Sequence, residues 1–187
     1  MKIGLASQSP RRQELLRAAG YELEIKPAHF DEKSGEGREA AEVVLFNACG
    51  KCREIAAQCG RDVPVLGADT VVVIDNVILG KPKDARDAVA MLKELRGRKH
   101  QVMTGVALAY GGQLLSRVAV TDVYVNDLTD QEIIDYVATG KPLDKAGAYG
   151  IQDGLVVDHI EGDYDNVVGL DMATVHELLC KLGLENK

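Results

Sequence analysis

One carboxylate stands out because it interrupts an apolar segment. Residues 63–74 are almost entirely apolar and rich in β-branched side chains, which predicts a buried strand, and Asp69 lies in the middle of it. Burying a carboxylate costs several kcal/mol unless it is paired or bound to a metal. We therefore expect Asp69 at a cleft, where it holds a metal or activates water, and a buried structural ion pair is the alternative. Glu32 in a polar loop is a candidate second carboxylate, although by itself it is typical of a solvated loop.

A second candidate group opens the first predicted helix. Ser9 suits the N-cap and Pro10 suits the first helical position. Free backbone N–H groups at such an end converge on one point, and Arg11 and Arg12 add donors that match phosphate oxygens. An ordinary capped helix with solvated arginines fits the same pattern, so the residues alone leave both interpretations open.

Two lysines are weaker candidates for holding an anion. Lys51 lies in a predicted helix, where lysine usually faces solvent, and Lys81 lies in the constrained loop between Gly80 and Pro82. The sequence contains no Walker A pattern, no G-x-G-x-x-G and no G-x-S-x-G. P-loop hydrolysis, Rossmann redox chemistry and a serine nucleophile elbow therefore have no support.

Charge and composition exclude further classes of function. The 187 residues carry 22 basic and 29 acidic side chains, for a formal net charge of -7, and 4% of them are aromatic, with no Trp. Such a chain offers neither a broad basic face nor a stacking platform, so we expect no binding to a nucleic acid polymer. The N-terminus lacks the apolar core of a signal peptide, and no apolar run approaches the roughly 20 residues of a membrane span. We expect a cytoplasmic protein that binds no membrane.

The elements that must hold these residues mix strands and helices along the chain. Strands are expected over residues 2–6, 63–74, 100–110, 113–125 and 155–160, and helices over residues 10–19, 39–58, 84–96, 129–139 and 172–182. Gly111-Gly112 predicts a hairpin, so at least one pair of strands is antiparallel. No linker or internal repeat divides the chain. The pattern predicts an α/β protein with a mixed sheet and a single domain over residues 1–187.

Several motifs together resemble the Maf family of nucleoside triphosphate pyrophosphatases, in the expected order and over nearly the whole chain. They are Ser7-Gln8-Ser9-Pro10-Arg11-Arg12-Gln13-Glu14-Leu15-Leu16, Asp31-Glu32, Ala48 to Lys51, Gly67-Ala68-Asp69-Thr70-Val71-Val72, Leu79-Gly80-Lys81-Pro82, His100 to Val106, Asp144 to Gln152, and Asn166-Val167-Val168-Gly169-Leu170.

This resemblance implies a fold and a reaction. The fold is a two-lobed α/β structure shared with inosine triphosphate pyrophosphatases, with a nucleotide groove between the lobes. The reaction is hydrolysis of a nucleoside triphosphate to the monophosphate and pyrophosphate with Mg²⁺ or Mn²⁺, which keeps non-standard nucleotides out of nucleic acids. The family is also associated with arrest of cell division. A homodimer is the oligomeric state that the resemblance implies.

The resemblance also implies roles for individual residues. Asp69 is similar to the family's proton acceptor, and Arg12, Thr70 and Gln152 to the positions that set base choice. Around these positions the chain resembles the subgroup that acts on dTTP and UTP. Together with the residues themselves, this predicts that Glu32 and Asp69 hold the metal. The substrate is then bound by Ser9, Arg11, Arg12, Lys51, Thr70, Lys81 and Gln152.

Two positions depart from the family pattern, and two other functions remain as alternatives. Asp153 follows Gln152 where Gly is common, and Asp171 follows Leu170 where Pro is usual. We expect Asp171 to start the last helix in place of the proline. One alternative function is a non-catalytic nucleotide-binding regulator of septum formation, which would not need Asp69 beside a polyphosphate. The other is the subgroup of the family that acts on 7-methyl-GTP.

Overall fold

The computed structural model describes residues 1–184. Its elements, in chain order, are β1 (Lys2–Leu5), α1 (Pro10–Ala18), β2 (Glu22–Ile25), α2 (Ala40–Ala56), β3 (Val65–Ile74), β4 (Val77–Leu79), α3 (Ala85–Leu95), β5 (Lys99–Tyr110), β6 (Gln113–Val125), α4 (Asp130–Ala138), the short 3-10 helices η1 (Lys141–Asp144), η2 (Ala146–Ala148) and η3 (Ile151–Asp153), β7 (Val157–Glu161), α5 (Tyr164–Val168) and α6 (Met172–Lys181).

The strands form one mixed sheet, which confirms the predicted α/β class. Its order is β2-β1-β3-β5-β6-β7, with β4 beside the far end of β3. β1 runs parallel to β2 and β3, and all the other pairs are antiparallel. No helix within residues 1–184 is long and apolar enough to cross a membrane.

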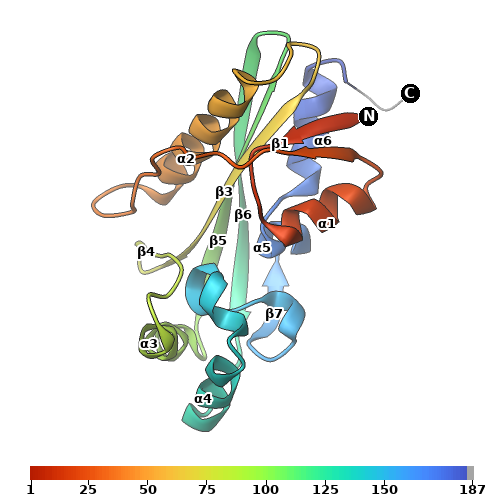
Figure 1. The fold of residues 1–187 in the computed structure, drawn as a ribbon. Coiled ribbons are helices and arrows are strands. Elements are labelled where there is room, and N and C mark those ends of the chain that lie inside the picture. The colour runs from red at the N-terminus through yellow and green to blue at the C-terminus, as the bar shows by residue number, and fades with distance from the viewer. Residues whose placement is uncertain (185–187) are drawn as a thin grey trace.

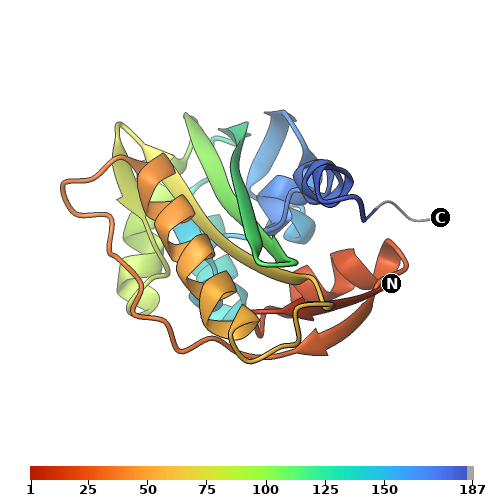
Figure 2. The ribbon, with the colours of Figure 1, turned by 90° about the horizontal axis from the view of Figure 1, so that it is seen from above.

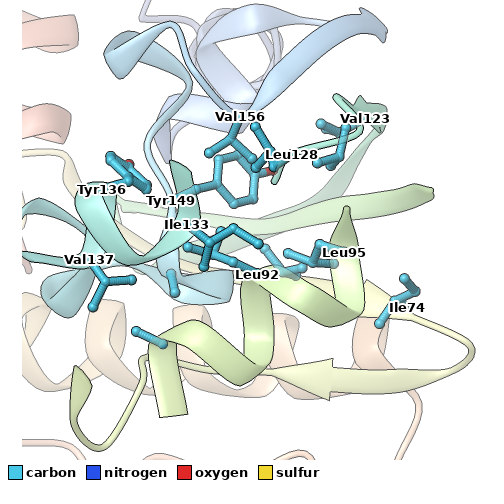
Figure 3. Close-up of a cluster of buried hydrophobic side chains, with 14 of the residues drawn as sticks. Ile74, Leu92, Leu95, Val123, Leu128, Ile133, Tyr136, Val137, Tyr149 and Val156 are labelled. Carbon is cyan, nitrogen blue, oxygen red and sulfur yellow. The ribbon is translucent and has the colours of Figure 1, made fainter. Parts of the chain in front are cut away.

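Helices α1 and α6 lie near one end of the long strands β3, β5 and β6, and α3 and α4 lie near the other end (Figure 1). Each pair packs over its own hydrophobic cluster, and these are two of the four clusters in the described residues. In the larger lobe, α1 and α6 bury Leu16, Val175 and Leu178 against Leu66 and other sheet residues. In the smaller lobe, α3 and α4 pack with the end of the sheet and the segment that holds Tyr149; Figure 3 shows the side chains of this core, which include Leu92, Leu95, Ile133, Tyr136, Tyr149 and Val156. The strands that run through both lobes fix the position of one relative to the other.

The edge of β3 between the two lobes is open. On one side β3 pairs with β5 from Val65 to Val73. On its other side it pairs with β1 at Val65 and Leu66, and with β4 only from Val72 onward. Residues 67–71 therefore have no strand neighbour on that side within the described part of the chain. Since Asp69 and Thr70 lie in this gap and adjacent strand residues point to opposite faces, their side chains flank the same opening from two sides.

Helix α2 approaches the sheet closely because two strand positions are glycine. Figure 2 shows α2 lying along the sheet face above β3 and β5. A Cβ added at Gly67 would lie 2.4 Å from the Ala48 carbonyl oxygen, and one at Gly105 would lie 2.3 Å from that of Val44. Both are far below ordinary van der Waals contact, so only glycine lets the helix backbone rest directly on the strands.

Local sequence signals predicted most element boundaries. Ser9, Asp84 and Thr129 cap α1, α3 and α4, and Thr129 forms a complete capping box. Asp171 caps α6 by accepting a hydrogen bond from the Thr174 backbone N–H, so it starts this helix as expected. The prediction missed the short helix α5 and the 3-10 helices η1, η2 and η3.

We expect Gly105→Ala to destabilise the protein and to lower its activity, because the added methyl group collides with the backbone of α2. Overpacking of this kind costs about 1–3 kcal/mol, measured as the free energy of unfolding in urea. Gly60→Ala is the matched control, because nothing lies within 4 Å of a Cβ at that position. Equal stabilities for the two variants would contradict the close approach of α2.

Candidate active site

A cleft of about 920 Å³ opens at the free edge of β3, between the two lobes. All nine residues predicted from the sequence to act in the site line it: Ser9, Arg11, Arg12, Glu32, Lys51, Asp69, Thr70, Lys81 and Gln152. The cleft also gathers more basic than acidic side chains, since Lys33, Lys83 and Lys145 join the predicted cations. The structure thus brings the predicted residues together, and their individual roles stay predictions.

Asp69 lies at one end of a chain of charged groups that has Lys51 at its centre. Its Oδ1 is 3.4 Å from Lys51 Nζ, which in turn is 2.8 Å from Glu32 Oε1. The side chains of Lys51 and Asp69 are only 12% and 13% exposed, whereas that of Glu32 is half exposed. Lys51, whose position the sequence pattern left open, therefore faces the sheet and pairs with both carboxylates. The buried Asp69 thus has the charged partner that its burial requires.

Asn47 is a site residue that sequence reasoning missed. Its amide donates a 2.9 Å hydrogen bond to Asp69 Oδ2, and it also exchanges hydrogen bonds with the backbone N–H and C=O of Lys33. A single buried side chain thus orients Asp69 and ties down the loop that carries Glu32. The available signal was the position of Asn47 in an apolar helix, one turn before Lys51, which places both side chains on one helix face.

The carboxylates fit a divalent cation that also takes oxygens from a phosphorylated ligand. Glu32 and Asp69 supply the oxygen donors that Mg²⁺ and Mn²⁺ prefer, and the same lysine bridges them. Within residues 1–184, no group of three or more His, Cys, Asp or Glu side chains could hold a metal without further ligands. This donor set suits Mg²⁺, which is commonly bound through one or two carboxylates together with substrate phosphates.

On the opposite face of β3, Arg12 and Thr70 form a polar cluster. The Arg12 guanidinium donates to Thr70 Oγ1 at 3.1 Å and to the Gly169 carbonyl at 2.8 Å. Thr70 Oγ1 also lies 2.9 Å from the hydroxyl of the fully buried Thr104. Burial lowers the pKa of the Arg12 guanidinium, and the nearby Asp69 carboxylate opposes that shift. Two of the three predicted specificity residues, Arg12 and Thr70, are therefore in direct contact and held in place by the protein itself.

The smaller lobe supplies the other wall of the cleft. Lys81 follows β4, Gln152 lies in η3, and both line the cleft opposite α1. Arg11, from the first turn of α1, reaches across and pairs with Asp144 of η1 at 3.2 Å. The predicted specificity residues thus come from three separate elements, α1, β3 and η3, and the last of these belongs to the other lobe.

Tyr149 forms part of the cleft wall and is anchored by a buried histidine. Its hydroxyl lies 2.7 Å from His100 Nε2, and the two rings meet edge to face. Both residues are at least 95% buried. Burial lowers the pKa of the His100 imidazole to about 4, so the ring is neutral near pH 7.

The cations and paired carboxylates in this cleft have the charge pattern of an α/β protein that binds a polyphosphate. Residues 2–182 match the family described as Maf-like protein, so the chain belongs to the Maf family. Two relatives named dTTP/UTP pyrophosphatase, from Shigella dysenteriae serotype 1 (strain Sd197) and Escherichia coli (strain K12), are each 48% identical over 177 residues. The alignments cover 94% of this chain and 90% of each relative.

Two solved structures align with part of this chain at low sequence identity. A nucleoside-triphosphatase / dITP/XTP pyrophosphatase from Mycobacterium abscessus is 19% identical, with a TM-score of 0.43, covering 68% of this chain and 76% of that one. The Ham1 protein of Staphylococcus aureus is 16% identical, with a TM-score of 0.47, covering 68% and 73%. The family assignment rests on the sequence comparisons.

We expect His100 to destabilise the fold in acid. Because the folded chain lowers the pKa of this histidine from 6.5 to about 4, the unfolded chain binds more protons between these values. The free energy of unfolding is therefore not reduced by this residue near neutral pH. It falls as the pH drops from about 6.5 toward 4, by about 2 kcal/mol between pH 7 and pH 5.

Urea denaturation at both pH values checks this, with His100→Gln as the variant that lacks the titrating group. His29→Gln, which removes an exposed histidine outside the cores, is the matched control. A His100→Gln protein that loses as much stability in acid as the parent would contradict the assignment.

Proposed function

We propose that this chain hydrolyses dTTP and UTP to the monophosphate and pyrophosphate. The observation that carries the proposal is the Asp69 carboxylate, held by Asn47 and Lys51 inside a cationic cleft. The choice of substrates is supported by relatives of that name, which are 48% identical over almost the whole chain. The reaction removes these nucleotides, and modified pyrimidine triphosphates of the same shape, before a polymerase uses them.

Asp69 is suited to act as the general base. The oxygen of a water molecule forms a bond to the α-phosphorus, its proton passes to the carboxylate, and the bond to the bridging oxygen breaks to release pyrophosphate. Hydrogen bonds from Asn47 and Lys51 fix the orientation of the carboxylate before the substrate arrives. Such preorganisation contributes to the rate because no reorientation is needed in the transition state.

The charged side chains of the cleft suit a triphosphate. Arg11, Lys51 and Lys81 would bind its oxygens, and Ser9 lies at the N-terminus of α1, where the helix dipole favours an anion. Glu32 and Asp69 would hold Mg²⁺ or Mn²⁺. When bound, the cation neutralises phosphate charge and lowers the pKa of water.

Base choice would come from Arg12, Thr70 and Gln152. The pairing edge of a uracil or thymine presents carbonyl groups and a ring N–H, and the Gln152 amide can match one of each. A base with a different pattern leaves buried polar groups without partners, and that penalty produces selectivity. The direct contact of Arg12 with Thr70 supports a shared role for these two residues.

The remaining parts of the proposal rest on the family resemblance. They are a homodimer and a link to arrest of cell division. We also propose a cytoplasmic location, as expected from the sequence. A non-catalytic regulator of septum formation would bind the same nucleotides without turnover, and a member of the other subgroup would prefer 7-methyl-GTP. Measured turnover and substrate preference distinguish these alternatives from the proposed activity.

We expect Asp69→Asn to lower kcat for dTTP at least about 100-fold, because the amide keeps the shape of the carboxylate but cannot accept the proton. The measurement is release of pyrophosphate with Mg²⁺ or Mn²⁺, and it should cease when the metal is chelated. Asp62→Asn makes the same change in an exposed turn and should leave the rate unchanged. Turnover of Asp69→Asn at the parent rate would refute the mechanism, and release of orthophosphate would refute attack at the α-phosphorus.

We expect Gln152→Ala to reduce selectivity among bases more than it reduces the rate with the best substrate. The side chain would contact the base and not the α-phosphorus, and loss of one such hydrogen bond corresponds to about a tenfold change in relative kcat/KM. A panel of dTTP, UTP, ATP, GTP and 7-methyl-GTP measures this, with Gln58→Ala in the exposed turn after α2 as control. Equal kcat/KM for pyrimidine and purine triphosphates in the parent would defeat the claim.

A further inference from the structure

The turn that carries Gln152 is hydrogen-bonded to helix α4 through one buried hydroxyl group. Tyr136 Oη donates a 2.6 Å hydrogen bond to Asp153 Oδ2 and accepts a 3.0 Å hydrogen bond from the Gly150 backbone N–H. These two contacts lie on either side of Gln152 in the sequence. Asp153, which departs from the glycine common in the family, therefore has a specific partner in this chain.

Tyr136 is a rigid anchor for these contacts. It lies on α4, is 5% exposed, and its ring packs in the core of the smaller lobe with Ile133 and Tyr149 (Figure 3). Burial, and then the hydrogen bond to Asp153, raises the pKa of the Tyr136 hydroxyl, so it stays protonated and able to donate at neutral pH. The capping box at Thr129 in turn fixes the start of the helix that carries it.

The turn also follows the buried Tyr149, which fixes where it begins. Its remaining backbone hydrogen bonds are local, from Asp153 N–H to the Gly150 carbonyl at 3.1 Å and from Gly154 N–H to the Ile151 carbonyl at 3.3 Å. A rigid-body shift of residues 150–154 would preserve both of these bonds. The hydrogen bonds to Tyr136 are different, because they connect the turn to a separate helix.

The position of Gly150 sets the space available to the Gln152 side chain. A Cβ added at Gly150 would lie 3.1 Å from Gln152 Oε1 and 2.9 Å from Lys145 Cε, so both side chains lie directly against this residue. A shift of the Gly150 backbone therefore displaces the Gln152 amide within the cleft. An amide that must match a carbonyl and an N–H of one base tolerates little displacement.

We propose that Tyr136 and Asp153 are positioning residues for base selection, and that together they hold the Gln152 amide where it can read a pyrimidine. This inference rests on the proposed function, in which Gln152 contacts the base. Neither residue touches the reacting atoms. The pair acts through the turn it holds, so its loss should alter discrimination between bases while the chemical step continues.

The test compares Tyr136→Phe, which removes only the hydroxyl, with Tyr110→Phe at the distant β5–β6 hairpin as the matched control. Values of kcat and KM are measured with dTTP, UTP, GTP and 7-methyl-GTP. We expect Tyr136→Phe to raise KM for dTTP and UTP and to lower their kcat/KM relative to GTP by about three- to tenfold, the effect of one hydrogen bond. Their kcat should change less than about threefold, and Tyr110→Phe should match the parent.

A second pair of variants keeps the test decisive if Tyr136→Phe does not fold. Asp153→Asn retains an oxygen that accepts the hydrogen bond from Tyr136 and should keep the selectivity of the parent, whereas Asp153→Ala should lose it. An unchanged ratio of kcat/KM values in Asp153→Ala would overturn the inference, as would an equal loss with every nucleotide. A parent protein that does not cleave dTTP or UTP would instead refute the proposed function, so the two failures are distinguishable.

Discussion

The site depends on how closely α2 can approach the sheet. Because Gly67 and Gly105 have no side chains, the helix carbonyls of Ala48 and Val44 rest on β3 and β5 at a distance that a methyl group would prevent. At this separation Asn47, on the inward face of α2, reaches Asp69 directly. Lys51 follows four residues later and reaches the same carboxylate. A helix displaced outward would leave Asp69 buried without partners, which is the costly state for a carboxylate.

The same arrangement explains why a lysine lies between two carboxylates. Lys51 offsets the burial of Asp69 and pairs with Glu32 in the loop before α2. Asn47 holds the same loop through the backbone of Lys33. Two carboxylates and one ammonium leave a net negative charge at this point, amid the basic side chains that line the rest of the cleft. A triphosphate with its cation complements both parts of this pattern, because the anion suits the basic walls and the cation suits the carboxylates.

Features that depend on short stretches of sequence could be predicted, and features that depend on packing could not. Asp69 was predictable because one charge interrupts an apolar strand, and the caps at Ser9, Asp84 and Thr129 because they precede the helices they start. Asn47 was missed because its partner Asp69 lies on a strand, and the helix sequence does not show which strand residue its amide contacts. The bond between Tyr136 and Asp153 joins residues 17 positions apart on different elements, and no local pattern marks such a pair.

The two lobes contribute differently to the site, and the sheet determines how they cooperate. Asp69, Asn47 and Lys51 come from β3 and α2, so the groups suited to catalysis share one rigid unit. Base selection, as proposed, would combine Arg12 and Thr70 with Gln152 across the cleft, so it would depend on the relative position of the lobes. The ion pair of Arg11 with Asp144 bridges the cleft, but its aspartate side chain is 65% exposed, and exposed pairs contribute little. The relative position of the lobes is therefore maintained mainly by β3, β5 and β6, which run through both hydrophobic cores.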